Sequence, residues 1–407
     1  FFERPKVQVE TIPIGKGVPI GIETVTNPVL GIGGAYGTWG EDYDNANLAS
    51  FVERRLGRSL EPGDRLNLSE LGFDNRHHLS VMSDEEHLEL EVKVGARFLR
   101  AAAAANGWDP SEVQGVLVGT SGPASVDYTE KIAREAGIPE DAINVSIHKA
   151  CDGSVAGLNL ALNPNVPENT KMPVNLAEEL YGKKVLVGGI EGLSRFVQLS
   201  HDTNALQLFG NGAGIIGVVP GKTMKFLVGG THEVYDTEGV LEVRMYYPYS
   251  HKLANEDSLI EVTQTGKNHY RIAGLMHEPD VDSPVVMAGP MGMVKLFVRT
   301  GVQVVQEVYH SYQKRMAELD MPGKDLAVAI VHHANYKINQ LLEKHLQKEG
   351  IHLRMPWLLR EFGNVSAASN MIAFLRELSN LKPGDNILFD GFGAGTYYDV
   401  LAVELGG

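Results

Sequence analysis

The sequence is poor in cysteine, in long apolar runs and in net positive charge. It contains a single cysteine among 407 residues, which excludes a disulfide framework within the chain and suits a reducing cytoplasm. No stretch approaches the roughly 18 consecutive apolar residues of a transmembrane helix, and no apolar signal-peptide core is present. The formal net charge of −15 argues against a nucleic-acid partner, which usually requires a basic face. We therefore expect a cytoplasmic protein that binds neither nucleic acid nor a membrane.

The residues that are present indicate an α/β protein. Hydrophobic residues make up 43% of the chain and charged residues 21%, and 45 glycines suit tight turns and close backbone contacts. Apolar segments at 113–119, 184–191 and 326–331 read as buried strands, and helical patterns follow at 84–106, with Asp84 as its N-cap, and at 291–319. Such strand–helix alternation favours mostly parallel sheets with helices on both faces.

The single cysteine lies where a strand meets a helix. Residues 144–149 alternate as a strand does, and the small-residue segment 154–162 is typical of a buried helix. A thiol at this joint lies near the first free N–H groups of the helix, where the positive end of the macrodipole favours a thiolate. A lone cysteine is nevertheless more often a buried small apolar residue, so the rest of the sequence has to decide its role.

An internal duplication points to a shared cleft. The segment Gly210–Gly214 and the segment Gly391–Gly395 are each followed by an apolar strand. The strand at 113–119 precedes Cys151 by about the interval that separates the strand at 326–331 from Asn364. Duplicated units of this kind change the interpretation of the whole fold. We predict two fused halves, residues 1–222 and 223–407, with 223–285 as a connecting region of hairpin and loops.

Three side chains would meet in the cleft between such halves. Cys151 could act as a nucleophile, His332 could donate Nε2–H, and Asn364 could donate a carboxamide N–H to the oxyanion of a thioester. Taken singly, a histidine at a strand end is more often structural, and an asparagine before Val-Ser is more often a helix cap. Their occurrence together at matching positions favours an active site.

At this point five short blocks resemble a known family. They look like the signature blocks of β-ketoacyl-acyl-carrier-protein synthase III, one of the thiolase-fold condensing enzymes. The blocks are Ala150-Cys-Asp-Gly153, Phe209-Gly-Asn-Gly-Ala-Gly214, His332-His-Ala-Asn335, Gly363-Asn-Val-Ser-Ala-Ala-Ser369 and Gly391-Phe-Gly-Ala-Gly395. The stretch Gly72–His77 also resembles a family segment. The resemblance implies a five-layered αβαβα thiolase-like fold and a homodimer.

The resemblance also assigns roles. Cys151 is implied to be the acylated nucleophile, and His332 and Asn364 are implied to bind the thioester carbonyl and promote decarboxylation. The backbone of Phe392 and Gly393, with the N–H of Cys151, is implied to form the oxyanion hole. The reaction implied is a decarboxylative Claisen condensation of the acyl-cysteine with a malonyl-type thioester on an acyl carrier protein, in fatty-acid or polyketide-type metabolism.

Further residues carry weaker expectations. By the resemblance, Lys337 and Arg76 bind the substrate or the carrier protein. Lys337 is equally readable as a solvated helix residue. His333 replaces the family's usual glutamine and is read as a neighbour of the active site, with a second acid/base as the alternative. The substrates are expected to be coenzyme A or carrier-protein thioesters, with no cofactor and no metal.

Two rival functions stay open on the sequence alone. The first is an acyltransferase that passes the acyl group from Cys151 to an alcohol, amine or thiol without decarboxylation. The presence of both His332 and Asn364 favours condensation, because simple acyl transfer has less need of an enolate site. The second is a non-catalytic partner subunit, against which the intact set of cysteine, histidine and asparagine argues.

Overall fold

The computed structural model describes residues 6–166, 171–198, 200–235, 259–274 and 290–406. Much of the connecting region predicted at 223–285 lies outside these residues. Among the described residues, no helix is long and apolar enough to cross a membrane.

The larger sheet forms the core of the N-terminal part of the chain. Within the described residues it has nine strands, in the spatial order β1 (Lys6–Ile12), β2 (Val18–Asn27), β3 (Ile32–Trp39), β9 (Gly212–Val218), β8 (Val185–Glu191), β6 (Gly115–Gly119), β7 (Ile143–His148), β12 (His269–Gly274) and β11 (Ile260–Gly266). The central strands β6, β7 and β8 are fully buried. Strand β6 has the continuous apolar sequence expected of a buried strand, whereas β7 also buries the polar side chains of Asn144, Ser146 and His148.

A second sheet faces the first. In the described part of the chain it has four strands, in the order β10 (Met224–Glu233), β15 (Tyr397–Leu405), β14 (Asn386–Gly393) and β13 (Val328–Val331). Strands β4 (Glu41–Asp44) and β5 (Asn75–His78) form a separate antiparallel two-stranded sheet. Most of the described strand pairs are antiparallel, so the prediction of mostly parallel sheets was wrong. Strands β1, β2 and β3 are joined by hairpins, β9 pairs antiparallel with β3, and β15 pairs antiparallel with β14.

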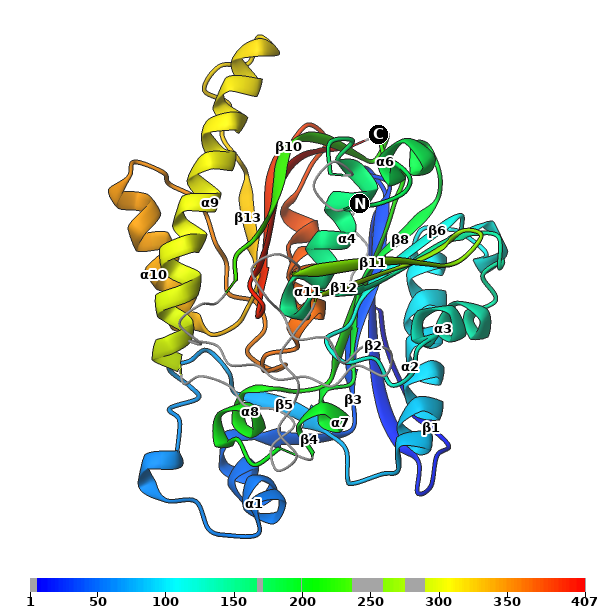
Figure 1. The fold of residues 1–407 in the computed structure, drawn as a ribbon, viewed down its shortest axis with the longest axis vertical. Coiled ribbons are helices and arrows are strands. Elements are labelled where there is room, and N and C mark those ends of the chain that lie inside the picture. The colour runs from blue at the N-terminus through cyan, green and yellow to red at the C-terminus, as the bar shows by residue number, and fades with distance from the viewer. Residues whose placement is uncertain (1–5, 167–170, 199, 236–258, 275–289, 407) are drawn as a thin grey trace.

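Helices fill the remaining layers (Figure 1). Helices α2 (Asp84–Ala105) and α3 (Tyr128–Ala136) cover the outer face of the large sheet. Helices α4 (Gly153–Leu162) and α11 (Ser369–Glu377) lie between the two sheets. Helices α9 (Pro290–Glu318) and α10 (Tyr336–Lys348) lie on the far side of the small sheet. The order helix, sheet, helix, sheet, helix confirms the predicted five-layered αβαβα architecture.

The shorter elements connect these layers. They are α1 (Asn45–Leu56), α6 (Leu176–Leu180), α7 (Leu193–Val197), α8 (Thr203–Leu208) and the 3₁₀ turns η1 (Pro62–Asp64), η2 (Pro110–Glu112), η3 (Ala150–Asp152), η4 (Ser366–Ala368) and η5 (Leu378–Asn380). Turn η3 leads into α4 and turn η4 leads into α11, so the two central helices begin in the same way. This correspondence agrees with the duplication read from the sequence.

Local details differ from the sequence predictions. Ser83, and not Asp84, caps α2, because its side chain accepts the N–H of Glu86. Glycines 212 and 214 lie inside β9, and glycines 391 and 393 lie inside β14, where corners before the strands were predicted. The hairpin β11–β12 pairs with β7 of the large sheet. The division of the chain at residues 222 and 223 stays a prediction.

The ends of strands β6 and β8 allow the central helices to pack closely. A methyl group added at Gly119 of β6 would lie 2.5 Å from the backbone carbon of Gly153. A methyl group at Gly189 of β8 would lie 2.6 Å from the backbone of Ala367. Because both neighbours are backbone atoms, neither can rotate away. Glycine at these two positions therefore lets the starts of α4 and α11 rest directly on the large sheet.

We predict that Gly189→Ala lowers the free energy of unfolding by about 1–3 kcal/mol, because the added methyl displaces the backbone of η4. Gly21→Ala is the matched control, since a methyl at Gly21 of β2 in the same sheet meets nothing within 4 Å. We expect the control to stay within about 0.5 kcal/mol of the parent. Urea unfolding measures both. Equal stability of the two variants would contradict the close packing of η4 on β8.

Candidate active site

The cysteine lies on a strained turn between a strand and a helix. Strand β7 ends at His148, and η3 carries Cys151 into α4. Ala150, just before the cysteine, has a φ of 49°, in the left-handed region that non-glycine residues rarely adopt. Ser366, at the start of η4, has the same φ of 49°. The two halves therefore use the same strained turn, one to present Cys151 and the other to present Ser366.

The sulfur of Cys151 meets the second half of the chain directly. Ser366 Oγ lies 3.2 Å from Cys151 Sγ, within hydrogen-bonding distance, and a serine hydroxyl can donate to sulfur or accept from a thiol. Cys151 keeps partial exposure, whereas Ser366 is buried. Burial raises the pKa of the thiol to about 12; the Ser366 bond lowers it, and nearby carboxylates raise it further. The sequence predicted a thiolate at this helix start, but burial of the sulfur favours the neutral thiol.

His332 lies at the end of β13 with one ring nitrogen free. Its Nδ1 lies 2.6 Å from Ser369 Oγ, which also accepts the backbone N–H of His333. The hydroxyl proton of Ser369 can therefore donate to Nδ1, which places the ring proton of a neutral imidazole on Nε2. This Nε2 is buried and has no hydrogen-bond partner among the described residues. Burial lowers the pKa of His332 to about 3, so the ring is neutral at physiological pH.

Asn364 is buried beside the same turn. Its side-chain oxygen accepts the N–H of Ser366 at 2.9 Å, and its amide nitrogen donates to the carbonyl of Ala334 at 3.3 Å. A carboxamide has two N–H groups, so one donor of Asn364 is left for a ligand. Its backbone pairs with Leu208 and Gly210, next to the glycine-rich block of the first half. Val365, and not Asn364, is the N-cap of η4, so the interpretation of Asn364 as a helix cap was wrong. Its side chain instead binds the N–H of the first residue of that turn and retains a free donor.

The segment predicted to form the oxyanion hole reaches both catalytic candidates. The ring of Phe392 lies edge-on to the ring of His332, with 5.1 Å between the centroids. A methyl added at the next residue, Gly393, would lie 2.8 Å from the backbone nitrogen of Cys151. Strand β14 therefore connects the histidine to the cysteine turn. Pairwise contacts thus link the 392–393 segment to His332 and to the cysteine turn, and link Asn364 to Cys151 through Ser366. The assignment of Cys151, His332 and Asn364 as the catalytic residues stays a prediction.

His333 points away from this centre into a structural contact. Its Nε2 accepts the backbone N–H of Leu358 at 3.1 Å, so its Nδ1 carries the proton and donates to the carbonyl of Val331 at 2.7 Å. Its ring stacks on Trp357 at 4.3 Å. Burial lowers the pKa of His333 to about 4. Both ring nitrogens are occupied by backbone groups, which supports the interpretation of His333 as a neighbour and not a second acid or base.

The two residues predicted to bind substrate or carrier protein lie in different surroundings. Lys337 is exposed on α10, and its ammonium group lies 3.7 Å from the carboxylate of Glu70. Arg76 is fully buried in the described chain, where it donates to the carbonyl of Tyr43 and to the side chain of Asn45. Only Lys337 is therefore placed to meet a macromolecular partner at the surface.

A buried group of charges beside the cysteine was missed from the sequence. The ammonium group of Lys149 lies 3.0 Å from Asp399, 3.6 Å from Asp152 and 3.9 Å from Glu233. Burial opposes the charge of Lys149, but these carboxylates outweigh burial and raise its pKa. Burial and the charge of Asp399 raise the pKa of Asp152 well above its usual range. Burial and the neighbouring carboxylate therefore favour the neutral form of Asp152.

A buried carboxylate on the other side of the cysteine was also missed. Glu191, the last residue of β8, accepts hydrogen bonds from Ser121 and Thr120, which follow β6, and from the backbone N–H of Ala367. Burial raises the pKa of Glu191, although the hydrogen bonds oppose this shift. The sequence signal for Glu191 was a charged residue at the end of an otherwise apolar strand.

The sequence signal for the group around Lys149 was the pair of charged residues, Lys149 and Asp152, on either side of Cys151.

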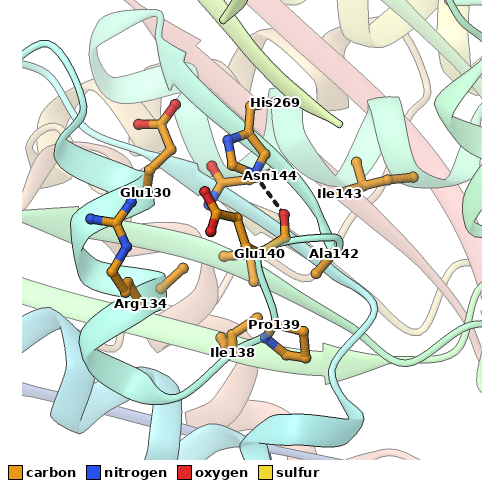
Figure 2. A pocket seen from close by; sticks show the side chains of 11 residues that line it. Glu130, Arg134, Ile138, Pro139, Glu140, Ala142, Ile143, Asn144 and His269 are labelled. Carbon is orange, nitrogen blue, oxygen red and sulfur yellow. Dashed lines mark hydrogen bonds between the residues drawn. The ribbon is translucent and has the colours of Figure 1, made fainter. Parts of the chain in front are cut away.

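A separate pocket lies away from the cysteine. Figure 2 shows its lining, a cavity of about 140 Å³ that includes Glu130, Arg134 and His269. It opens at the start of β7, near Asn144, whereas Cys151 follows the end of that strand. Roughly 20 Å of strand separates the two ends. None of the predicted site residues lines this pocket. No group of three or more His, Cys, Asp or Glu side chains suited to a metal ion occurs among the described residues.

Comparisons with known proteins agree with the site. Residues 316–405 match the family model described as 3-oxoacyl-[acyl-carrier-protein] synthase III C terminal. The β-ketoacyl-[acyl-carrier-protein] synthase III of Clostridium tetani is 25% identical over 354 residues, covering 85% of this chain and 91% of that protein.

Two solved structures share the fold. The synthase III of Thermus thermophilus superposes with a TM-score of 0.61 at 18% identity, over 90% of this chain and 96% of that one. The tetrahydroxynaphthalene synthase of Streptomyces coelicolor, a type III polyketide synthase, superposes with a TM-score of 0.59 at 15% identity. The superposition covers 90% of this chain and 97% of that one. The fold is thus the thiolase fold. With its matching C-terminal segment, the chain is a thiolase-fold enzyme similar to β-ketoacyl-acyl-carrier-protein synthase III.

We predict that His333→Ala destabilises the protein without removing its chemistry. The substitution leaves two buried backbone groups without partners and a gap beside Trp357, which should lower the free energy of unfolding by about 2–4 kcal/mol. Urea unfolding measures this change. Acyl-adduct formation on Cys151, measured by intact mass per folded molecule, should remain. A stable variant that has lost adduct formation would instead make His333 an acid or base of the reaction.

Proposed function

We propose that the protein catalyses a decarboxylative Claisen condensation through an acyl-Cys151 intermediate. Cys151 accepts an acyl group from a coenzyme A or carrier-protein thioester. A malonyl-type thioester on an acyl carrier protein then loses CO₂, and the resulting enolate attacks the acyl-cysteine. The product is a β-ketoacyl thioester for fatty-acid or polyketide synthesis. The synthase III names of the relatives and the polyketide synthase among the structural neighbours support this class of reaction.

One observation carries the proposal. The unpartnered Nε2 of His332 and the free amide N–H of Asn364 are neutral donors. Asn364 binds the N–H of Ser366, which contacts the sulfur of Cys151, and His332 packs on Phe392, next to the glycine that faces the cysteine turn. Neutral hydrogen-bond donors that are already in position in a buried site stabilise the negative charge that develops on an enolate oxygen. A plain acyl transfer has no enolate to stabilise. The pairing of a nucleophile with two such donors therefore favours carbon–carbon bond formation.

The charge state of His332 fits this role. With its pKa lowered to about 3 by burial, the imidazole is uncharged at every pH at which the protein is expected to work. It can donate Nε2–H to the enolate oxygen, and it does not supply a proton by titrating near neutrality. The pH dependence of condensation is therefore expected to come from other groups.

Partners are proposed on the same basis. We infer a cytoplasmic homodimer that receives its extender unit from an acyl carrier protein, with Lys337 as a basic contact for that carrier. Lys337 is exposed, and its ion pair with Glu70 is a weak surface interaction, so a partner carboxylate can replace it. Among the described strands, β1 and β11 are the edges of the large sheet at which a second copy could pair, because β7 is already covered by β12.

We predict that His332→Ala and Asn364→Ala still form the acyl-Cys151 adduct but condense about 10²–10³-fold more slowly, because each lacks one donor to the enolate oxygen. Intact mass measures the adduct. Release of labelled CO₂ from malonyl carrier protein measures the second step.

Cys151→Ala is the matched control and should form no adduct. If both donor variants lose adduct formation as severely as condensation, the assigned roles are wrong. Acyl product formed by the parent protein without CO₂ release would instead show transfer to another acceptor. No adduct with any thioester would identify a non-catalytic subunit.

A further inference from the structure

A continuous line of hydrogen bonds leads from the cysteine to a buried carboxylate. Cys151 Sγ lies 3.2 Å from Ser366 Oγ, which lies 2.5 Å from Ser121 Oγ. Ser121 Oγ in turn lies 2.6 Å from Glu191 Oε2. Both parts of the chain contribute to the line, because Ser366 begins η4, whereas Glu191 ends β8 and Ser121 and Cys151 follow the ends of β6 and β7. The condensation chemistry described above does not use this line.

The line is buried along its length. Ser121, Ser366 and Glu191 are 4%, 1% and 1% exposed. The carboxylate of Glu191 is fixed by further donors, from the hydroxyl of Thr120 at 3.0 Å and the backbone N–H of Ala367 at 3.2 Å. Among the described residues no Lys, Arg or His forms an ion pair with it. A carboxylate held only by neutral donors can accept a proton without breaking an ion pair.

We propose that Ser366, Ser121 and Glu191 form a proton relay that deprotonates Cys151 as it attacks the acyl donor. This inference rests on the proposed acylation of Cys151 and adds its proton acceptor. Ser366 touches the reacting sulfur. Ser121 and Glu191 act through Ser366 and position it for proton transfer.

The transfer is balanced along the line. The Cys151 S–H bond breaks as its proton passes to Ser366 Oγ, the Ser366 proton passes to Ser121 Oγ, and the Ser121 proton passes to Glu191. The electron pair left on sulfur forms the new S–C bond, and the C–S bond of the donor thioester breaks. The three protons then return in the reverse direction, so that the donor leaves as a thiol and Glu191 is again ionised. No net charge enters or leaves the line.

The two hydroxyls suit either direction of the line. Each serine has one proton and can accept as well as donate. With a thiol at one end and a carboxylate at the other, every proton points toward Glu191. With a thiolate and a carboxylic acid, every proton points toward Cys151, which is the orientation in which Ser366 donates to sulfur. The same atoms therefore stabilise both charge states.

The other charged groups near Glu191 are already occupied. Glu91 of α2 is bound by Arg195 of α7 at 3.1 Å and by the hydroxyl of Tyr128 of α3 at 3.0 Å. Asp152 of η3 lies 3.6 Å from the ammonium group of Lys149, and burial and the charge of Asp399 raise its pKa well above its usual range. Cys151 is the remaining titratable group that faces the line. Among these groups, Glu191 is the acceptor that can take the thiol proton through the two serines.

The test measures alkylation of Cys151 by iodoacetamide between pH 6 and pH 10, which needs no acyl substrate. In the parent protein, once Glu191 is ionised, the distribution of one proton between sulfur and carboxylate does not depend on pH. The rate should therefore show a plateau around neutral pH. In Glu191→Gln the plateau should disappear and the rate should rise about tenfold per pH unit toward the pKa of the thiol, about 12.

The same variants are then acylated in a single turnover with an acyl-coenzyme A. Glu191→Gln, Ser121→Ala and Ser366→Ala should each acylate about 10²-fold more slowly at pH 7, the usual contribution of a positioned base. Ser121→Thr keeps the hydroxyl and should recover most of the rate. If Glu191→Gln does not fold, Ser121→Ala decides the question with the same two measurements.

Thr120→Val is the matched control, because Thr120 binds the same carboxylate but lies off the line. It should keep the plateau and acylate within about threefold of the parent. The relay is refuted if Glu191→Gln keeps both the plateau and the rate, or if Thr120→Val loses as much as Ser121→Ala. Because alkylation requires no thioester, a failure of condensation alone would count against the proposed function and not against the relay.

Discussion

The contact between turns η3 and η4 is the constraint on which the site depends. Each turn begins with a residue at a φ of 49°, and each rests on a strand end of the large sheet where only a glycine fits. The first turn presents the sulfur of Cys151, and the second presents the hydroxyl of Ser366 and the carboxamide of Asn364. Any shift of one central helix relative to the other would separate these groups. The glycines at 119 and 189 are therefore part of the active-site geometry even though they contact no substrate.

Burial of this contact determines its electrostatics. It raises the pKa of Cys151 and lowers that of His332, so both groups are neutral at rest. A neutral imidazole is the right donor for an enolate oxygen, but a neutral thiol is a poor nucleophile. The same dry environment thus favours the second step of the proposed reaction and hinders the first. A site of this kind needs a proton acceptor for the cysteine that is separate from the histidine.

The sequence was sufficient for the fold class, and it singled out Cys151, His332 and Asn364, whose catalytic roles stay a prediction. Short blocks with fixed residue types and a repeated order of strands and helices carry that information. The direction of the strands was less predictable, because an apolar segment pairs equally well with a parallel or an antiparallel neighbour. The sequence predicted that His333 lies next to the active site. It did not predict the hydrogen bonds of its ring to the backbone of Val331 and of Leu358, the second of which lies 25 residues away in the chain.

The residues that were missed share a physical cause. Glu191, Ser121 and Ser366 lie far apart in the chain, and no local pattern marks them as a group. Lys149 and Asp152 lie next to the cysteine, but their partner Asp399 is almost 250 residues away. Pairings of this kind follow from the register of β15 against β14 and from the packing of η3 on both. They can be found only when the strands are placed in space.

The two buried groups on either side of the cysteine differ in what they can do with a proton. On one side, Lys149 pairs with Asp399 and outweighs burial in lowering the pKa of that carboxyl group, while burial and the charge of Asp399 raise the pKa of Asp152. Moving a proton there would disrupt a buried ion pair, which is costly. On the other side, Glu191 is held by hydroxyl and amide donors that tolerate either charge state. The charged group therefore fixes the position of the turn, and the carboxylate bound by neutral donors is the one suited to exchange a proton with the sulfur.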